Sequence, residues 1–475
     1  MIYYREDVRQ LNISCLYDEV AQEPLVLTID RFVEQLDLGA LHARYSEAGT
    51  GYYDPGMQLK VWFLAYCDGD WHCWDVAQRV RYDVRYRYFV GSRRPDFRTL
   101  NRFRKDHLAL LVDIFAALVA HCEELGLIDA SVVVLDGTKL RANASGRKRR
   151  KRDSLREQIR RRLAHDVGAD DLGTEAQASE AAGAEANDST PVVSATDPEA
   201  RLMKTGEGTV RLCYNAQVVV DNHQIIVAAD VGNDADDKSS LPPLLEQAER
   251  QLGEELGAIV ADGGYYSGGN VKYAQRRGLD VYIRKGKDRH GVFGQDQFEY
   301  DQVGDRYRCP HGRWLRRGGQ RRRPGVVKTI YRSTTKHCRD CPLKAACTKD
   351  RYRTLEVAET FAYEQELAAK LASPRGQAIA ARRRELVEPV FGNLKFNFGF
   401  TRFNLRGLAS VRGEFLLLCI AHNLKKLAQW SGGRLAVGAV GAVLGCITAW
   451  ASRFRLILRL PEPFRAKMTS AGSCL

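Results

Sequence analysis

Apolar residues in the first part of the chain recur with the spacing of helices. Pro55 opens the run Met57–Leu64, and a longer apolar series follows Asp96, a residue type that favours helix N-termini, and continues to Gly126. We therefore predict a helical N-terminal domain over residues 1–128. Such helices, with basic exposed faces, are typical of a helix-turn-helix-like DNA reader, although an ordinary bundle has solvated basic faces too. The residues expected on these faces are Arg79, Arg81, Arg85, Arg98, Arg102, Arg104 and Lys105.

From residue 129 onward, short apolar runs alternate with helical segments. The β-branched run 131–136 ends in an acid, which is the pattern of a buried strand with a carboxylate at its end. Alternating strands and helices with a hairpin among them predict an α/β fold. The elements expected are a strand over 131–136, a hairpin over 214–229, a helix over 243–252, a strand over 258–261, a helix over 271–277, a strand over 279–283 and long helices over 377–391 and 408–430.

Two charged segments interrupt this alternation. Residues 147–162 hold ten Lys or Arg against two acids, and Leu155, Ile159 and Leu163 recur every four residues, so part of this segment is predicted to be a basic amphipathic helix. Residues 166–199 hold nine acids and no Lys or Arg, a composition that indicates a loosely ordered linker. The two segments together occupy about 146–200.

The overall charge narrows the choice of partner. The chain of 475 residues has a net charge of +13 and a pI near 9.2, which suits a polyanion such as nucleic acid but also a protein that is merely basic. No apolar leader follows Met1, so we expect a cytoplasmic, nucleoid-associated protein. The uncharged stretch Leu435–Trp450 is short and interrupted by glycines, and we expect no membrane partner.

Three acids form the candidate catalytic set. Asp136 and Asp262 each end an apolar run and each precede a glycine, which is expected to let the backbone turn and expose the acid at the sheet edge. Glu388 lies in a predicted helix, one turn after Arg384. Carboxylates that converge repel one another unless cations lie between them, and Mg²⁺ or Mn²⁺ suits such hard oxygen ligands.

Two such ions can activate a water or a 3′-hydroxyl and stabilise the leaving oxygen of a phosphodiester. Lys139, Arg384 and Lys395 are the nearby basic residues expected to hold the DNA backbone. Two tyrosines, Tyr265 and Tyr266, follow Asp262. We expect them to pack at the sheet edge, with stacking on an unpaired base as the alternative.

These motifs resemble those of the DDE transposases of bacterial insertion sequences, in the branch with a Tyr-Arg-Glu-Lys signature. The segments 134–139 and 260–267 look like the family's two aspartate motifs, and Arg384, Glu388 and Lys395 have the spacing of the signature. The signature's tyrosine falls at Ala381 and is absent. Glu385, one turn from Glu388, is the rival for the third acid. The resemblance covers about residues 15–430.

The resemblance implies an RNase H-like mixed sheet flanked by helices. Asp136, Asp262 and Glu388 would bind two Mg²⁺ or Mn²⁺ ions, and Arg384 and Lys395 would contact the ends of the element. It also implies a homodimer or larger synaptic complex that brings these ends to target DNA. The expected parts are a DNA-binding domain over 1–128, catalytic core over 129–294 and 361–430, a Cys-rich insertion over 295–360 and a tail over 431–475.

Three other readings stay open at this stage. The chain could be a transposase derivative that binds DNA without cutting it, which the loss of the signature tyrosine at Ala381 favours. It could be an RNase H-like nuclease without strand transfer. It could also be a structural zinc protein, in which case the three acids would lie far apart in the fold.

Four cysteines of the insertion are spaced like metal ligands. Cys338 and Cys341 form a Cys-x-x-Cys pair, and Cys309 and Cys347 complete a set of four thiols. Four thiolates suit a structural Zn²⁺, and His311 and His337 are the rival ligands. Four reduced thiols without metal are the alternative reading.

Overall fold

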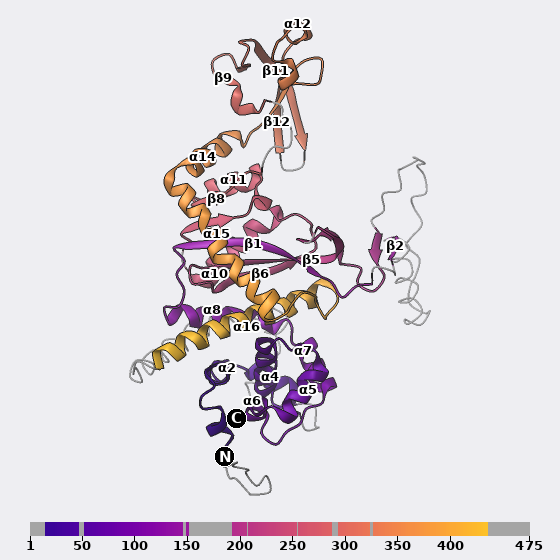
Figure 1. Ribbon diagram of the computed structural model, residues 1–475, viewed down its shortest axis with the longest axis vertical. Helices are drawn as coiled ribbons and strands as arrows, with labels where there is room; N and C mark the ends of the chain where they lie inside the picture. Colours follow the sequence, from indigo (N-terminus) through magenta and orange to yellow (C-terminus); the bar gives the residue numbers. More distant parts are fainter. Residues whose placement is uncertain are drawn as a thin grey trace, which may run out of the picture.

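In the computed structural model the described residues are 15–46, 52–145, 149–151, 192–206, 208–253, 255–286, 293–323 and 326–435. Three regions follow one another along the long axis: helices from the N-terminal part, a central sheet with its own helices, and a smaller sheet at the far end (Figure 1). The basic helix predicted within 147–162 and the tail after residue 435 lie outside the described residues, except that Arg149–Lys151 form a short strand, β2.

The N-terminal region is helical, as the apolar spacing predicts. Two aspartates cap helices of this region. Asp54 accepts a hydrogen bond from the backbone N–H of Met57 at 2.6 Å, and Asp96 accepts one from the backbone N–H of Thr99 at 2.7 Å. Its helices are α1 (Leu16–Val20), α2 (Pro24–Glu34), α3 (Gly39–Ser46), α4 (Pro55–Asp68), α5 (Cys73–Tyr82), α6 (Val84–Val90), α7 (Phe97–Asp106) and α8 (Leu110–Glu124).

The apolar series that begins at Asp96 forms two helices rather than one. His107 ends α7 with a φ of −117°, outside the helical range. Its side chain is buried and hydrogen-bonded to the hydroxyl of Tyr45 at 2.6 Å, so a tertiary contact holds the break in place. Gly126 follows α8 with a φ of +67°, a conformation that glycine adopts without strain.

The prediction of seven exposed basic residues is wrong for Arg104 and needs correction for two others. Arg104 is buried and lies over the Trp62 ring at 4.3 Å. Arg79 and Arg85 are half-buried and form ion pairs with Asp70 and Asp68, at 2.6 Å and 2.9 Å. These three arginines are therefore engaged by carboxylates or an aromatic ring within the fold and are not available on the surface as predicted. The exposed ones are Arg81, Arg98, Arg102 and Lys105.

The central sheet is mixed. Strand β1 pairs antiparallel with β5 and parallel with β7, β7 pairs parallel with β8, and β5 also pairs antiparallel with β4 and β6. The predicted hairpin and strands are all present within this sheet. The strands are β1 (Val132–Arg141), β4 (Arg201–Lys204), β5 (Val210–Val220), β6 (Ile226–Gly232), β7 (Ala258–Ala261) and β8 (Val281–Ile283).

Helices cover this sheet. Helix α15 packs against β1, β7 and β8, whereas α10 packs against β5, β6 and α8. Helix α14 packs against α11 and α15, and Figure 1 shows α15 crossing the sheet beside β1. The helices of this part are α10 (Leu241–Leu252), α11 (Gly268–Arg276), α14 (Phe361–Ala372), α15 (Pro374–Gly392) and α16 (Leu408–Leu435), with short turns η1 (Lys238–Ser240), η2 (Gly263–Tyr265) and η4 (Asn393–Asn397).

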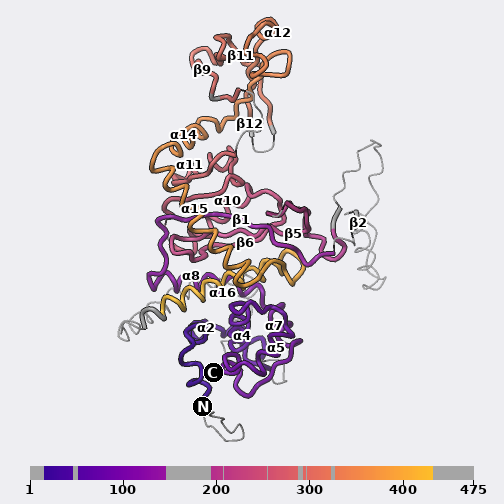
Figure 2. The backbone as a smooth tube through the Cα atoms, viewed as in Figure 1, coloured from indigo at the N-terminus to yellow at the C-terminus, as the bar shows by residue number. Residues whose placement is uncertain are grey.

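Helix α16 joins the N-terminal region to the sheet, although the two are far apart in sequence (Figure 2). It packs against α2, α4 and α8 on one side and against β6 on the other. The amide of Asn423 donates to the carbonyl of Ile226 at 2.8 Å, and the carboxylate of Glu414 accepts from the backbone of Leu405 at 2.9 Å. Among the described helices, none combines the length and apolar character that a bilayer crossing requires.

The insertion forms a separate antiparallel sheet with its own apolar core. That core contains Phe298, Tyr307, Leu315 and Tyr331 and does not merge with the core of the rest of the chain. The insertion consists of η3 (Gln295–Gln297), β9 (Glu299–Asp301), β10 (Arg306–Arg308), β11 (Trp314–Arg323), β12 (Val326–Arg332), α12 (Thr335–Arg339), α13 (Lys344–Cys347) and β13 (Thr354–Ala358). A further two-stranded ribbon pairs β2 with β3 (Val192–Ser194). Strand β2 belongs to the segment predicted as a basic helix, and β3 belongs to the segment predicted as an acidic linker.

Candidate active site

Two of the three predicted acids lie side by side. In the parallel ladder Leu135 of β1 is opposite Ala261 of β7, so Asp136 and Asp262 occupy the next position on each strand. Parallel neighbours run in the same direction, and the residues that follow the paired segment therefore meet at one edge. The side chain of Asp136 is largely buried, whereas that of Asp262 is half-exposed.

The guanidinium of Arg383, in α15, lies between these two carboxylates. Its Nη1 is 2.6 Å from Oδ2 of Asp136 and its Nη2 is 3.8 Å from Oδ1 of Asp262. Sequence reasoning selected the adjacent Arg384, whose side chain is 80% exposed. A signal for Arg383 was available: the apolar Val387 follows it by one helical turn and marks the face that packs on the sheet.

Asp136 is in an environment that disfavours its charged form. Burial raises its pKa to about 6, against the opposing effects of Arg383 and of the Gly137 backbone N–H, which donates to Oδ1 of Asp136 at 2.8 Å. The nearby carboxylates of Asp262 and Asp237 raise this pKa further. A cation close to Asp136 would therefore favour the charged form of this carboxyl.

The third predicted acid, Glu388, is not grouped with this pair as a metal site. Its side chain is 61% exposed, and its carboxylate lies 3.9 Å from the guanidinium of Arg384 on the same helix. Its rival Glu385 is also exposed and pairs with Arg382 at 3.1 Å. The structure thus brings two of the three acids together and leaves the glutamate on the solvent side of α15.

A fourth acid, which sequence reasoning missed, lies beside the pair. Asp237 ends the acidic run after β6, and its Oδ1 accepts from Asn215 at 2.6 Å, from Gln217 at 2.7 Å and from Lys139 at 3.1 Å. The hydroxyl of buried Tyr265 donates to the amide oxygen of Gln217. The predicted DNA contact Lys139 is therefore engaged inside the protein, and Tyr265 packs rather than stacks on a base.

The glycines after the two aspartates make room for this network. A Cβ at Gly137 would lie 2.5 Å from Nε2 of Gln217, and one at Gly264 would lie 2.6 Å from Oδ2 of Asp237. The expected sharp turn is wrong for Gly137, which stays within β1, opposite Gln217 of β5. Because side chains alternate across a strand, Asp136 faces α15 while the Gln217 amide fills the opposite face.

The donor set at Asp136 and Asp262 fits a divalent cation in part. Both offer hard carboxylate oxygens, and Arg383 already supplies positive charge at the position between them. Within the described ranges, no three His, Cys, Asp or Glu side chains are grouped so that they could hold a metal ion. The two aspartates fit such a site, and Glu388 would have to turn from Arg384 to join it.

The four predicted cysteines of the insertion line one small pocket, but no three of these described residues are grouped so that they could hold a metal ion without rearrangement. They are Cys309, Cys338, Cys341 and Cys347. Sγ of Cys309 accepts a hydrogen bond from the backbone of Arg313 at 3.3 Å, across a turn in which Gly312 has a φ of +76°. Burial raises the pKa of the Cys347 thiol, and the other three thiols add to the rise.

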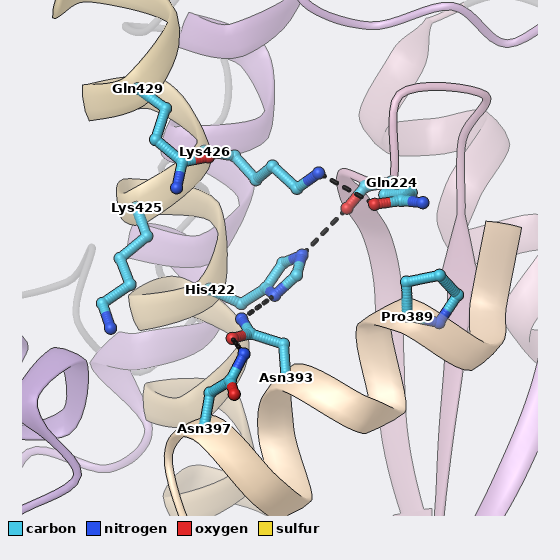
Figure 3. Close-up of a pocket in the computed structure, with 8 residues that line it drawn as sticks. All are labelled: Gln224, Pro389, Asn393, Asn397, His422, Lys425, Lys426 and Gln429. Carbon is cyan, nitrogen blue, oxygen red and sulfur yellow. Dashed lines mark hydrogen bonds between the residues drawn. The ribbon is translucent and has the colours of Figure 1, made fainter.

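A larger pocket of about 430 Å³ lies beyond the glutamate, where η4 meets α16 (Figure 3). Its lining includes Pro389, the residue after Glu388, and it also includes Asn393. Inside it the buried ring of His422 accepts from Asn393 through Nδ1 at 2.9 Å and donates from Nε2 to the carbonyl of Gln224 at 2.9 Å. The other lining residues are Gln224, Asn397, His422, Lys425, Lys426 and Gln429.

Comparison with known families gives two matches. Residues 14–106, which contain helices α1 to α7, match a family described as a transposase domain (DUF772). Residues 308–428, which contain most of the insertion, α14, α15 and most of α16, match a family described as a transposase DDE domain. No curated protein matches the chain. Both matched families are transposase domains, and the chain belongs to the DDE transposases of the insertion-sequence type.

Proposed function

We propose that this transposase cuts DNA at the ends of its element and joins the freed 3′-hydroxyl to target DNA, with Asp136, Asp262 and Glu388 as its metal-binding catalytic acids. The observation that carries the proposal is the adjacency of the two aspartates in the β1–β7 ladder, with Arg383 in contact with both. Two carboxylates this close repel each other, so the pair is stabilised by a cation, which Arg383 supplies here and a divalent metal would supply more strongly. Glu388 completes the set through its place on the same helix as Arg383.

The strand arrangement supports an RNase H-like core. A central β1 has the antiparallel strands β5 and β6 on one side and the parallel strands β7 and β8 on the other. The crossover from β7 to β8 runs through α11, as parallel neighbours require. The finer assignment to the branch with the Tyr-Arg-Glu-Lys signature rests on the spacing of Arg384, Glu388 and Lys395 alone, with Ala381 in place of the tyrosine.

The metal site that we propose is formed by Asp136, Asp262 and Glu388, and it takes Mg²⁺ or Mn²⁺. When bound, two such ions supply an activated water or 3′-hydroxyl and stabilise the leaving oxygen of the phosphodiester. The protein's own part is to hold the two aspartates at one edge and to present Arg383 to the phosphate between them. Arg384, exposed on the same helix, and Lys395, in η4, contact the flanking backbone.

This proposal predicts metal-dependent nicking of a duplex that carries an element end. Asp262→Asn, which keeps the size of a side chain half-exposed to solvent, should reduce nicking to background while DNA affinity stays within about twofold. Product strands on a denaturing gel measure the first quantity, and fluorescence anisotropy measures the second. The matched control is Asp280→Asn. Asp280 directly precedes β8 and pairs with Lys370 of α14, and this variant should cut normally.

Undiminished cutting by the Asp262→Asn protein would refute the catalytic assignment. Absence of nicking by the unaltered chain, with DNA binding retained, would favour a derivative that has lost catalysis, the reading for which the missing tyrosine at Ala381 speaks. A nuclease without strand transfer would release nicked DNA but no joined product when a target plasmid is added. We infer a homodimer or larger synaptic complex, because two ends must be cut and joined together.

We also propose that Cys309, Cys338, Cys341 and Cys347 hold one structural Zn²⁺ in the insertion. The support is that all four thiols line one pocket, beside the knuckle-like turn at Gly312. Four thiolates are a common structural zinc set, and a closed tetrahedral site would tie α12 and α13 to the loop after β10. His337, which also lines the pocket, is the rival ligand.

A further inference from the structure

The pocket beyond Glu388 has the charge of an anion-binding site. Its charged lining residues are Lys425 and Lys426, and its other polar members are amides and His422. In the part of the chain that the structure describes, neither ammonium forms an ion pair with a carboxylate: Lys425 lies over the ring of Phe398 at 4.4 Å, and Lys426 donates to Oε1 of Gln224 at 2.9 Å. Burial lowers the pKa of Lys426 and the nearby carboxylate of Asp221 opposes this effect, so two lysines face one nearby acid and the lining of the pocket stays positive.

The two lysines are neighbours on α16, and their side chains diverge from that helix (Figure 3). Figure 3 shows Lys426 reaching toward Gln224, while Lys425 extends toward the turn that carries Asn397. Burial lowers the pKa of Lys426, so its ammonium is partly deprived of water and would gain from a bound anion. Two lysine side chains that diverge in this way suit successive phosphates of a backbone better than one small anion.

An exposed aromatic ring lies on the same turn. Phe396 in η4 is 85% exposed, whereas Leu394 and Phe398, two residues to either side, are buried. The turn has π-helical geometry, which is uncommon and recurs at functional sites. Phe396 does not line the pocket but directly precedes Asn397, which does. An exposed ring on the same turn as a cationic pocket is the combination that single-stranded nucleic acid binds, through stacking of bases and pairing of phosphates.

We propose that η4 and α16 form a subsite for a single-stranded DNA segment, in which Phe396 stacks on an unpaired base and Lys425 and Lys426 bind the adjoining phosphates. The inference rests on the proposed function, because DNA is the polyanion that this function brings to Glu388. Pro389, directly after Glu388, lines the pocket, so a strand in the proposed active site has a short path to it. From Arg383 to Asn393 the helix rises about 15 Å, the length of two or three nucleotides.

The test separates the base from the phosphate contributions. Binding of a labelled 15-nucleotide oligothymidine, and of an abasic strand of equal length, is measured by anisotropy with the full chain in buffer without Mg²⁺, Mn²⁺ or chelator. Phe396→Ala should weaken oligothymidine binding about tenfold and leave the abasic strand unaffected. Phe396→Tyr, which keeps a ring, should bind like the unaltered chain, and Phe396→Leu, which keeps only apolar bulk, should bind like the alanine variant.

The contribution of the two lysines is tested by the salt dependence of DNA binding. Lys425→Gln with Lys426→Gln should weaken both strands and reduce the slope of log affinity against log salt by about 1.4, the value for two lost phosphate contacts on a single strand. Thermal unfolding of each variant should match that of the unaltered chain. Unchanged binding of both strands by the phenylalanine and lysine variants would overturn the subsite.

Two other results would also overturn it. Normal binding by Phe396→Leu would reduce the ring to an apolar contact, and a change in sedimentation on Phe396→Ala without loss of DNA binding would make this surface a protein interface. Because binding is measured without Mg²⁺ or Mn²⁺, the outcome is independent of cleavage. A chain that nicks element ends but passes none of these tests loses the subsite alone, whereas a chain that binds neither strand nor any duplex loses the proposed function as well.

Discussion

At the scale of single residues, the acids are defined as much by their neighbours as by their own chemistry. Asp136 and Asp262 share Arg383, and Asp237 lies on the other side, held by Gln217 and two further donors. The polar network thus links β1, β5 and the loop after β7. A small displacement of that loop would move Asp262 relative to Asp136, which a shared metal site would not tolerate.

Gly264→Ala adds only one methyl group, but we expect it to impair cutting strongly. The added Cβ would lie 2.6 Å from Oδ2 of Asp237 and must displace either that carboxylate or the loop after Asp262. We expect a loss of stability of about 1–3 kcal/mol and at least a tenfold fall in nicking rate. Thermal unfolding and gel-based nicking assays measure the two effects.

Gly269→Ala is the matched control, because the nearest atom to its Cβ would be Oγ of Ser267 at an ordinary 3.8 Å. Alanine there also suits the start of α11. If the two alanine variants cut and melt alike, the space at Gly264 has no role in holding the loop.

His422 gives a residue-scale prediction on pH. Burial lowers its pKa to about 4, below the ordinary 6.5, and its ring nitrogens are both used in neutral form. The unfolded chain therefore binds this proton first as the pH falls, so folded stability declines between about pH 6.5 and pH 4. His422→Gln removes this titration.

The expected result is that the difference in free energy of unfolding between the unaltered chain and the His422→Gln variant shrinks by about 2 kcal/mol from pH 7 to pH 4.5. Denaturant melts at each pH measure it. A constant difference across that range would mean that the folded protein also protonates His422.

At the scale of elements, the insertion is a unit with a core of its own. Its sheet packs around Tyr307, Leu315 and Tyr331, and its cysteines gather at one end, near α12 and α13. A core this small gains little from apolar burial alone, and a metal cross-link is a common remedy in such units. The proposed zinc therefore belongs to the stability of this element rather than to the reaction.

Removal of the metal tests this reading. We expect about one zinc per purified chain by elemental analysis, and loss of that zinc from Cys338→Ser. Strong chelation should make the insertion sensitive to proteolysis while the rest of the chain stays folded. Cys419→Ser, a buried thiol in α16 outside the cluster, should keep its zinc. A chain purified without zinc from zinc-containing medium would favour four free thiols.

At the scale of the whole molecule, α16 is the element that unites the parts. It packs against α2, α4 and α8 and also against β6, so the N-terminal helices and the sheet are joined through one late segment of the chain. The matched segment 14–106 contains α2 and α4, which pack against α16, and the matched segment 308–428 contains most of α16 itself. The exposed basic residues of the N-terminal helices and those near Glu388 are thus carried on one body.

This arrangement, with a net charge of +13, predicts that duplex affinity falls steeply with salt. If 6–10 phosphates are contacted, raising salt from 50 to 200 mM should cost about a thousandfold or more in affinity. Anisotropy titrations over that range measure it. A nearly flat response would contradict a broad phosphate-binding surface, whatever the fate of the catalytic prediction.

The sequence by itself determined the elements and the chemistry that depends on local pattern. Periodicity predicted the strands that carry Asp136 and Asp262 and the helix that carries Glu388, because the spacing of apolar residues is a property of the segment itself. Acid-glycine pairs and the Arg-Glu-Lys spacing indicated the family, and the transposase families matched agree with it. The cysteine spacing predicted one zinc site, and the four cysteines line one pocket, although no three of the described His, Cys, Asp or Glu side chains are grouped so that they could hold a metal ion.

Only the tertiary structure decided which neighbours these residues have. Adjacent arginines differ by about 100° around a helix, and the packing of α15 on the sheet selected Arg383 rather than Arg384 for contact with the acids. Asp237 was missed because its partners, Asn215, Gln217 and Lys139, come from other segments of the chain. Phe396 was missed because its exposure depends on the packing of its neighbours, which a local pattern does not encode. Long-range contacts are fixed by the packing of whole elements, and for that reason the partners of each charge emerged only with the fold.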